Sequence, residues 1–332
     1  MLTVINDVHA GVERSAGTTT DSKLKLRLHI VAELKRLLDE TTDDVMILGD
    51  LFDKFDSSLF DSILVYNVLK DWLKNNPEVM YLVAGNHDVS KTSNVVGNFD
   101  LMKNLLSEFI NFIYIVEPAH TRYGYVIPHL PNQEAFNKAL ALVPEVPVLF
   151  LHCNYDNNFA AQSDQSLNIS KEQVEACKAE RILIAHEHCQ KLSGKVTIPG
   201  NQIATSVSDW QGCNAKYMAR VDIEGRITMS KVAEKSVEYT EQLWTDPQVT
   251  THKFVKLVGT ATAEQAAQVV SAVAKFRAIS PAFVVANGVQ IEADGGTAGF
   301  DAALEGVRAF DVFKALEEVL NESEMNVLKE LE

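Results

Sequence analysis

The chain has 332 residues, a length typical of about two domains. Hydrophobic residues make up 46% of it and charged residues 23%, which excludes a disordered tail and provides for a sizeable core. With 45 acidic against 30 basic residues the net charge is −15, which excludes a protein that coats nucleic acid through Lys and Arg. An enzyme acting on DNA is still allowed, because a site that holds divalent cations is itself acidic.

The sequence favours a reduced, cytoplasmic protein. No stretch reaches the roughly 20 apolar residues of a membrane helix, and residues 1–7 lack the basic and apolar regions of a secretion signal. The cysteines show no C-x-x-C spacing, which argues against a structural zinc site or a disulfide framework. They are Cys153, Cys177, Cys189 and Cys213. Cys153 and Cys189 adjoin histidines, and both are expected to be buried as small hydrophobic side chains rather than to bind metal.

Short β-branched runs alternate with amphipathic stretches along the first part of the chain, which predicts alternating strands and helices. Strands are expected at residues 2–6, 45–48, 79–84, 113–116, 123–127, 148–151 and 182–185. Helices are expected at residues 24–38, 59–73, 133–142 and 171–179. After residue 195 the pattern becomes antiparallel, with strands at 196–198 and 203–206 and a hairpin of 217–221 and 227–232. This order predicts an α/β sandwich of mixed sheets flanked by helices.

A second, smaller unit is expected near the end of the chain. Residues 233–250 are polar without strong periodicity, so they are expected to be a link. Beyond it the predicted order is strand 254–258, helix 263–276, strand 283–286 ended by Asn287-Gly288, and helix 308–320. We therefore expect a catalytic domain over residues 1–235 and a small α/β domain over residues 250–332 that ends in helices.

Five clusters of His, Asp and Asn directly follow predicted strands. They are Asp7-Val8-His9, Gly49-Asp50-Leu51-Phe52-Asp53, Gly85-Asn86-His87-Asp88, His152 and His186-Glu187-His188. Because the carboxyl ends of strands in an α/β sheet converge on one edge, these clusters are expected to form one pocket. Carboxylates, an amide oxygen and imidazoles without thiolates suit Mn²⁺, Fe²⁺ or Zn²⁺. Seven candidate ligands are too many for one tetrahedral ion, and they fit two ions about 3.5–4 Å apart that share a carboxylate.

These strings, in this order and each after a strand, resemble the calcineurin-like metallophosphoesterases over roughly residues 1–210. The resemblance implies a first metal held by Asp7, His9, Asp50 and His188, and a second held by Asp50, Asn86, His152 and His186. It implies that a metal-bridging hydroxide attacks phosphorus, that His87 protonates the leaving oxygen as general acid, and that Asp53 orients the ring of His87. Ala185 departs from the family pattern, which usually has Gly before the last H-x-H, and this change bears on the loop rather than on the ligands.

A finer similarity is to the SbcD-type DNA exonuclease subunits of that superfamily. It rests on GDLFD at residues 49–53, on a long helix followed by VAGNHD, on Ile198-Pro199-Gly200-Asn201 after the H-x-H, and on a strand–helix–strand unit from Phe254 that is similar to a capping domain. The resemblance implies a Mn²⁺-dependent nuclease in DNA repair, usually a homodimer, working with an ATPase subunit of the SbcC type. The dimer contact is expected on the outer edge of an otherwise buried apolar stripe: Leu59, Ile63, Tyr66, Leu69 and Leu73.

A stand-alone phosphatase or small-nucleotide phosphodiesterase with the same metal pair is the alternative. The second unit favours the nuclease, because a small-molecule phosphatase needs no cap, whereas the charge of −15 and the lack of a basic stripe favour the alternative. A metal-binding scaffold without activity fits less well, because His87 and Asp53 exceed what structure alone requires. Four basic residues are candidates either for DNA-backbone contacts or for a solvated helix start: Arg14, Lys23, Lys25 and Arg27.

The remaining polar residues near the clusters have simpler interpretations. Asp88 is expected to lie behind the ligands or to cap a loop rather than to bind metal. Glu187 is expected to face solvent. His29 and His252 fit ordinary surface or packed positions, and His129 is open between such a position and one that lines the pocket.

Overall fold

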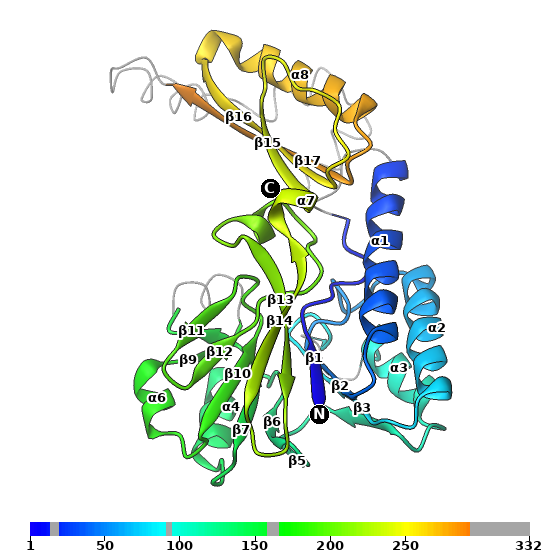
Figure 1. Ribbon diagram of the computed structural model, residues 1–332, viewed down its shortest axis with the longest axis vertical. Coiled ribbons are helices and arrows are strands. Elements are labelled where there is room, and N and C mark those ends of the chain that lie inside the picture. The colour runs from blue at the N-terminus through cyan, green and yellow to red at the C-terminus, as the bar shows by residue number, and fades with distance from the viewer. Residues whose placement is uncertain (14–19, 91–94, 158–165, 293–332) are drawn as a thin grey trace, which may run out of the picture.

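The structure is a computed structural model that describes residues 1–13, 20–90, 95–157 and 166–292 (Figure 1). Two six-stranded sheets form its larger part. The first has the order β14 (Ile227–Glu234), β13 (Ala215–Val221), β1 (Leu2–Ile5), β2 (Asp44–Leu48), β3 (Met80–Val83), β4 (Phe112–Ile115). The second has the order β11 (Lys191–Ser193), β12 (Val196–Ile198), β10 (Arg181–Ala185), β7 (Val148–His152), β6 (Gly124–Ile127), β5 (Ala119–Thr121). A separate two-stranded sheet pairs β8 (Asn154–Tyr155), which follows β7 in the chain, with β9 (Asn168–Ile169).

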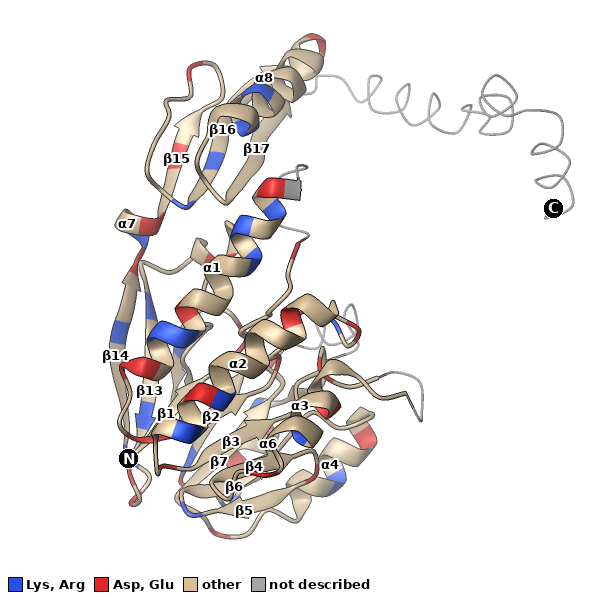
Figure 2. Cartoon of the chain, turned by 90° about the vertical axis from the view of Figure 1, so that its right-hand side faces the viewer, with Lys and Arg blue, Asp and Glu red and all other residues tan. Residues whose placement is uncertain are grey.

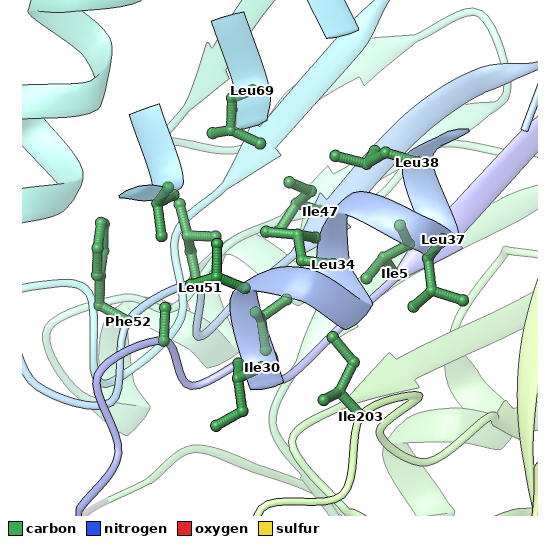
Figure 3. Packing of buried hydrophobic residues seen from close by; sticks show 14 of the residues in the cluster. Ile5, Ile30, Leu34, Leu37, Leu38, Ile47, Leu51, Phe52, Leu69 and Ile203 are labelled. Atoms are coloured by element: carbon green, nitrogen blue, oxygen red, sulfur yellow. The ribbon is translucent and has the colours of Figure 1, made fainter. Parts of the chain in front are cut away.

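The two sheets and their helices form a four-layer sandwich. One core lies between the sheets and includes Val4, Leu48 and Phe150. Helices α1 (Thr20–Asp39), α2 (Leu59–Asn75) and α3 (Asn98–Leu106) cover the first sheet, and α4 (Gln133–Ala141) and α6 (Lys171–Ala176) cover the second. Figure 3 shows how residues of α1 such as Leu34 pack onto Ile5 and Ile47 of the sheet. Strands buried on both faces explain the nearly continuous apolar runs of the sequence, and the predicted α/β sandwich is confirmed.

Parallel pairing fixes where the functional side chains lie. Strands β1, β2, β3 and β4 are parallel neighbours, and so are β6, β7, β10 and β12. His152 at the end of β7 has its Nδ1 3.3 Å from the carbonyl oxygen of Leu48 at the end of β2, so the carboxyl ends of both sets lie at the same end of the sandwich. The antiparallel pattern predicted after residue 195 is found for β13 with β14 and for β11 with β12. The strand expected at residues 203–206 does not form.

The segment 233–250 is more regular than its composition indicated. β14 runs to Glu234, α7 spans Lys235–Glu238, and β15 (Tyr239–Leu243) is an edge strand of the second unit's sheet, so helix or strand continues to residue 243. That sheet is completed by parallel β16 (Phe254–Thr262) and β17 (Val284–Glu292), with α8 (Ala266–Ile279) between them in the chain. Asn287-Gly288 does not end the last strand, which pairs with β16 through Glu292. The helices expected at 308–320 and near the end of the chain lie outside the described residues.

The second unit has a small core of its own and is also joined to the sandwich. Val255, Leu257 and Phe276 belong to the core under α8. Phe254 and Val284, at the base of the same sheet, belong to the core that α1 covers. The ring of His29 on α1 lies 4.6 Å from the ring of Phe283, between centroids, so His29 has a packed position as expected. No helix among the described residues combines the length and the apolarity that crossing a membrane requires.

Candidate metal centre

All five polar clusters lie at the carboxyl ends of parallel strands. Asp7 and His9 follow β1, Asp50 and Asp53 follow β2, Asn86 and His87 follow β3, His152 ends β7, and His186 and His188 follow β10. The first three strands belong to one sheet and the last two to the other. The clusters therefore meet where the two sheets face each other, at the end of the sandwich that carries the second unit (Figure 1).

The backbone at this edge is strained. Among the described residues other than glycine, five have a positive φ, and four of these are candidate ligands: Asp7 (53°), His9 (51°), Asp50 (51°) and His186 (91°). Such a conformation costs an L-residue roughly 1–3 kcal/mol and persists where the surroundings enforce it. The strain is thus concentrated in the loops that aim these side chains at one another, as is common at functional sites.

A first group of ligand atoms comes from Asp7, His9 and His188, which each offer an atom within 4.8 Å of the others. The Nε2 atoms of His9 and His188 are 3.2 Å apart, and His9 Nε2 is 3.9 Å from Asp50 Oδ2. The Asp7 carboxylate also accepts the backbone N–H of His186 at 3.0 Å. Asp7, His9, Asp50 and His188, the four residues that the resemblance assigns to one ion, therefore lie together.

A second group comes from Asp50, His152 and His186, again within 4.8 Å of one another. His152 Nε2 lies 3.3 Å from Asp50 Oδ2 and 3.0 Å from Asn86 Oδ1. Asp50 Oδ2 thus lies within 4 Å of a ring nitrogen from each group, as a carboxylate shared by two ions requires. The structure brings all seven candidate ligands into one cluster.

The donor set fits divalent cations. His188 Nδ1 lies 2.8 Å from the Asp209 carboxylate, so this nitrogen carries a proton and Nε2 is the nitrogen left to bind a metal. Burial lowers the pKa of His9 to about 3, so its ring is neutral. Its Nδ1 lies 3.6 Å from Asp53 Oδ1, on the Asp53 side of the ring, and its Nε2 is the nitrogen nearest His188. The Nε2 atoms of His9 and His188 face each other at 3.2 Å, so a cation that displaces the proton between them can take both nitrogens as ligands.

His87 and Asp53 are related differently from the expectation. The sequence analysis has Asp53 orienting the ring of His87. In the structure it is the backbone carbonyl of Asp53 that His87 Nδ1 contacts, at 2.7 Å, while the carboxylate faces His9. The His87 backbone N–H also donates to Asp50 Oδ1 at 2.9 Å, so the main chain and the ring of His87 are each anchored by one hydrogen bond. His87 offers an atom within 4.8 Å of ligand atoms of His9 and Asp50.

Three residues near the ligands have distinct positions. Asp88 is buried and accepts backbone N–H groups of Gly85 (2.9 Å) and Phe52 (3.1 Å), so it caps the loops behind the ligands as expected. Glu187 does not face solvent, because it is half-buried and its carboxylate accepts the Tyr155 N–H at 2.8 Å. His129 lies beside the cluster: burial, and then the charge of nearby His152, lower its pKa to about 4.

Sequence reasoning missed two residues that touch the metal centre. Asp209, in the short 3₁₀ helix Ser208–Trp210, contacts His188 Nδ1, and the buried Lys216 on β13 donates from Nζ to the backbone carbonyl of His188 at 3.1 Å. A single Asp in a loop and a single Lys in a strand carry no signal of their own in the sequence. Only the packing of the loop after β12 against β13 brings them beneath the ligand.

The cysteines differ in part from the expectation. Cys153 is buried as predicted, and the pKa of its thiol is raised by that burial. Cys189 is only half-buried, because its position after His188 places it in a surface loop. Its Sγ lies 3.6 Å from Cys213 Sγ, and burial raises its thiol pKa to about 11.

The basic residues at the start of α1 are paired with carboxylates of the same chain. Arg27 donates to both oxygens of Asp61 at 2.8 Å and contacts Glu13 at 3.1 Å. Lys23 pairs with Glu13 at 3.3 Å, and Lys25 pairs with an aspartate one turn earlier. Figure 2 shows basic and acidic residues interspersed along α1. Arg14 lies outside the described residues.

Metal uptake at the second group is expected to depend on pH. Burial opposes charge on the His152 ring, but the adjacent Asp50 carboxylate prevails and raises the pKa of His152 to about 9. At pH 7 the metal-free ring is therefore protonated, and an ion that binds there displaces one proton. Affinity should rise about tenfold per pH unit from pH 7 and level off above pH 9. Calorimetry of Mn²⁺ binding in buffers of different ionisation enthalpy measures the released proton; binding without release would contradict this prediction.

Gly49 is expected to tolerate no side chain. A methyl group there would lie 1.9 Å from His152 Nδ1, and the residue has a φ of +80°. We expect Gly49→Ala to lower the free energy of unfolding by more than the roughly 1–2 kcal/mol of the backbone conformation and to weaken metal binding by displacing His152. Gly212→Ala is the matched control, because its φ is +79° and no atom lies within 4 Å of the added methyl. Equal effects of the two substitutions in urea unfolding and metal titration would refute the role given to His152 packing.

Comparison with known proteins agrees with this geometry. The chain is similar over part of its length to the protein in the crystal structure of TT1561 of Thermus thermophilus, with 12% identity, 70% of this chain and 98% of that chain covered, and a TM-score of 0.40. At that score the likeness adds nothing to the assignment. No curated protein matches the sequence. The sequence profile described as calcineurin-like phosphoesterase matches residues 1–190, the part of the chain that holds all the candidate ligands. The chain therefore belongs to the calcineurin-like phosphoesterase family.

Proposed function

We propose that this phosphoesterase hydrolyses phosphodiester bonds of DNA as an SbcD-like nuclease with two divalent cations, Mn²⁺ by preference and otherwise Fe²⁺ or Zn²⁺. The observation that carries the proposal is the cluster of seven His, Asp and Asn side chains around Asp50, with His87 beside it. One ion is assigned to Asp7, His9, Asp50 and His188, and the other to Asp50, Asn86, His152 and His186. When bound, such a pair activates water and neutralises charge on a phosphate.

The chain's own residues then orient the ester and supply a proton. His87 points one ring nitrogen at the Asp53 carbonyl, 2.7 Å away, which fixes the ring and leaves Nε2 as its proton-transferring atom. We assign protonation of the leaving oxygen to this atom, a contribution of about 10²–10⁴-fold for a well-positioned acid. Asn86 Oδ1 lies 3.0 Å from His152 Nε2. Asp53 supports the site through His9 as well as through His87.

The second unit supports DNA as the substrate. It stands at the end of the sandwich where the metal centre lies, and it is joined there to α1 through Phe254, Val284 and the His29–Phe283 contact. A cap of this kind enlarges the surface around the site beyond what a small ester requires. We propose that it contacts the DNA, and that an ATPase subunit of the SbcC type works with the nuclease.

The homodimer proposal is supported by α2. Leu69 and Leu73 of its apolar stripe are buried, as expected for core positions. Leu59 and Ile63 are 68% and 50% exposed, and the neighbouring Phe60 is 44% exposed. An apolar surface of this kind at the start of one helix suits contact with a second copy of the chain.

A stand-alone phosphatase or small-nucleotide phosphodiesterase is the second candidate. It is supported by the net charge of −15. It is also supported by the ion pairs of Lys23, Lys25 and Arg27, because these pairs neutralise the basic groups at the start of α1. A small substrate needs no basic path for a DNA backbone.

The two candidates are separated by a substrate comparison. The protein is incubated with Mn²⁺ and end-labelled duplex DNA, end-labelled single-stranded DNA, bis(p-nitrophenyl) phosphate and p-nitrophenyl phosphate. The proposed function predicts shortening of labelled DNA and turnover of the diester. Turnover of a small ester with intact DNA would refute the nuclease proposal and favour the alternative. A chelated sample and a His87→Ala sample exclude contaminating nucleases.

A further inference from the structure

Beneath His188 lies a buried group of polar side chains that the ligand set does not include. Asp209 is 3% exposed, and its Oδ1 accepts from His188 Nδ1 at 2.8 Å. A carboxylate has no proton to give, so this contact requires the ring proton on Nδ1. In the neutral ring Nε2 is then the nitrogen with a lone pair, and it is the nitrogen that faces His9 at 3.2 Å.

The second oxygen of Asp209 is saturated by donors. Oδ2 accepts the backbone N–H groups of Thr205 (2.7 Å) and Ser206 (3.1 Å), the Thr205 hydroxyl (3.0 Å) and the Asn201 amide (3.2 Å). Four donors converge on this atom, and they hold the carboxylate in a single orientation. The other oxygen, Oδ1, is therefore the one that can accept from His188.

A buried lysine fixes both ends of this contact. Lys216 is 2% exposed, and its Nζ donates to the backbone carbonyls of Asp209 (2.6 Å) and His188 (3.1 Å) and to Asn201 Oδ1 (2.6 Å). All three ammonium protons are used in these bonds. Its positive charge also balances the buried carboxylate of Asp209, without which neither group is stable away from water.

We propose that Asp209 is a positioning residue that holds His188 in the Nδ1–H form, so that Nε2 is presented to the first metal, and that Lys216 holds Asp209 and the His188 backbone in register. The inference rests on the proposed metal-dependent function. Both supporting residues, Asp209 and Lys216, lie outside residues 1–190, the segment that the family profile matches.

The donors on Oδ2 make Asp209→Asn a sharp test. In the variant the amide oxygen is drawn to the position that faces four donors, which leaves the NH₂ group facing His188 Nδ1. An NH₂ donor there forces the ring proton onto Nε2, the atom that has to bind the metal. Asp209→Asn should therefore weaken metal binding by more than the loss of one negative charge would. Thr205→Val is the matched control, because it removes one donor to Oδ2 and leaves the proton on Nδ1.

The experiment reads the tautomer and the metal separately. Against the effect of burial, the Asp209 carboxylate raises the pKa of His188, so the metal-free full-length protein is studied at a pH where the ring is neutral. There, ¹⁵N NMR of labelled histidine, assigned with His188→Gln, should show His188 as Nδ1–H in the wild type and in Thr205→Val, and as Nε2–H in Asp209→Asn. In a Mn²⁺ titration of the same proteins, Asp209→Asn should lose affinity for one of two ions by about 10–100-fold and keep the other.

Two outcomes would overturn the inference. An Nε2–H tautomer in the wild type would do so without any variant, which keeps the test valid if Asp209→Asn does not fold. Unchanged tautomer and affinity in a folded Asp209→Asn would do so directly. Failure of the proposed function is a different result, because the wild type would then bind no Mn²⁺ at all, whichever nitrogen of His188 carries the proton.

Discussion

His87→Ala is expected to lower kcat on DNA by about 10²–10⁴-fold, the contribution of a positioned acid, while the protein still binds its metal ions. The physical reason is that the His87 ring is held by the Asp53 carbonyl and that its hydrogen bond to Asp50 comes from the backbone N–H, which the substitution keeps. The loss should be smaller on bis(p-nitrophenyl) phosphate, because a nitrophenolate leaves without a proton. Initial rates on both substrates and a Mn²⁺ titration measure the effect.

His120→Ala is the matched control for this substitution. His120 is an exposed histidine on β5 whose ring contacts Tyr125, far in the chain from any ligand. His120→Ala should leave the rates on both substrates and the binding of Mn²⁺ unchanged. Loss of a metal ion in His87→Ala would show that His87 is a ligand, a role that its proximity to His9 and Asp50 allows. An equal loss on both substrates would argue against proton transfer to the leaving oxygen.

Asp50→Asn is expected to weaken binding of both ions and to abolish turnover. Asp50 Oδ2 lies between His9 and His152, and the charge of His152 holds the pKa of Asp50 well below its ordinary value against the effect of burial. The amide keeps the shape of the side chain but removes the charge that both ions share. The loss in affinity should exceed the roughly 10–100-fold that follows removal of a group behind a ligand. Calorimetric titration with Mn²⁺ gives the affinity at each position.

Asp44→Asn is the control for the loss of a buried carboxylate. Asp44 begins the same strand, β2, is equally buried, and accepts from the Val79 N–H and the Tyr123 hydroxyl at the opposite end of the sheet. It should reduce stability without changing metal affinity. If Asp50→Asn weakened only one of the two ions, Asp50 would belong to a single position and not to both.

The sequence was sufficient for the parts of the site that depend on strand ends. Asp7, Asp50 and His152 each follow or end a buried apolar run, and parallel strands gather their carboxyl ends at one edge. The alternation of such runs with amphipathic helices was likewise enough to predict the α/β sandwich. These features are local in the chain, and the fold combines them in a regular way.

Other features depend on contacts between distant segments, which one sequence does not record. Asp209 meets His188 only because the loop after β12 folds back beneath β10. Glu187 is drawn inward by the Tyr155 N–H, although its place between two histidines suggested solvent. The Asp53 contact with His87 uses a backbone carbonyl, which any residue carries. The polar segment before residue 250 contains β15 because that strand pairs with β16, and the polar composition of the segment gives no sign of this pairing.

The number of divalent cations per chain tests most directly whether the clustered side chains form a dinuclear centre. Metal-free protein is titrated with Mn²⁺ by calorimetry, and the dialysed complex is analysed for bound metal. The arrangement of Asp7, His9, Asp50, Asn86, His152, His186 and His188 predicts two ions per chain. Saturation at one ion would contradict the sharing of Asp50, and no uptake would contradict the metal centre itself and every catalytic role assigned around it.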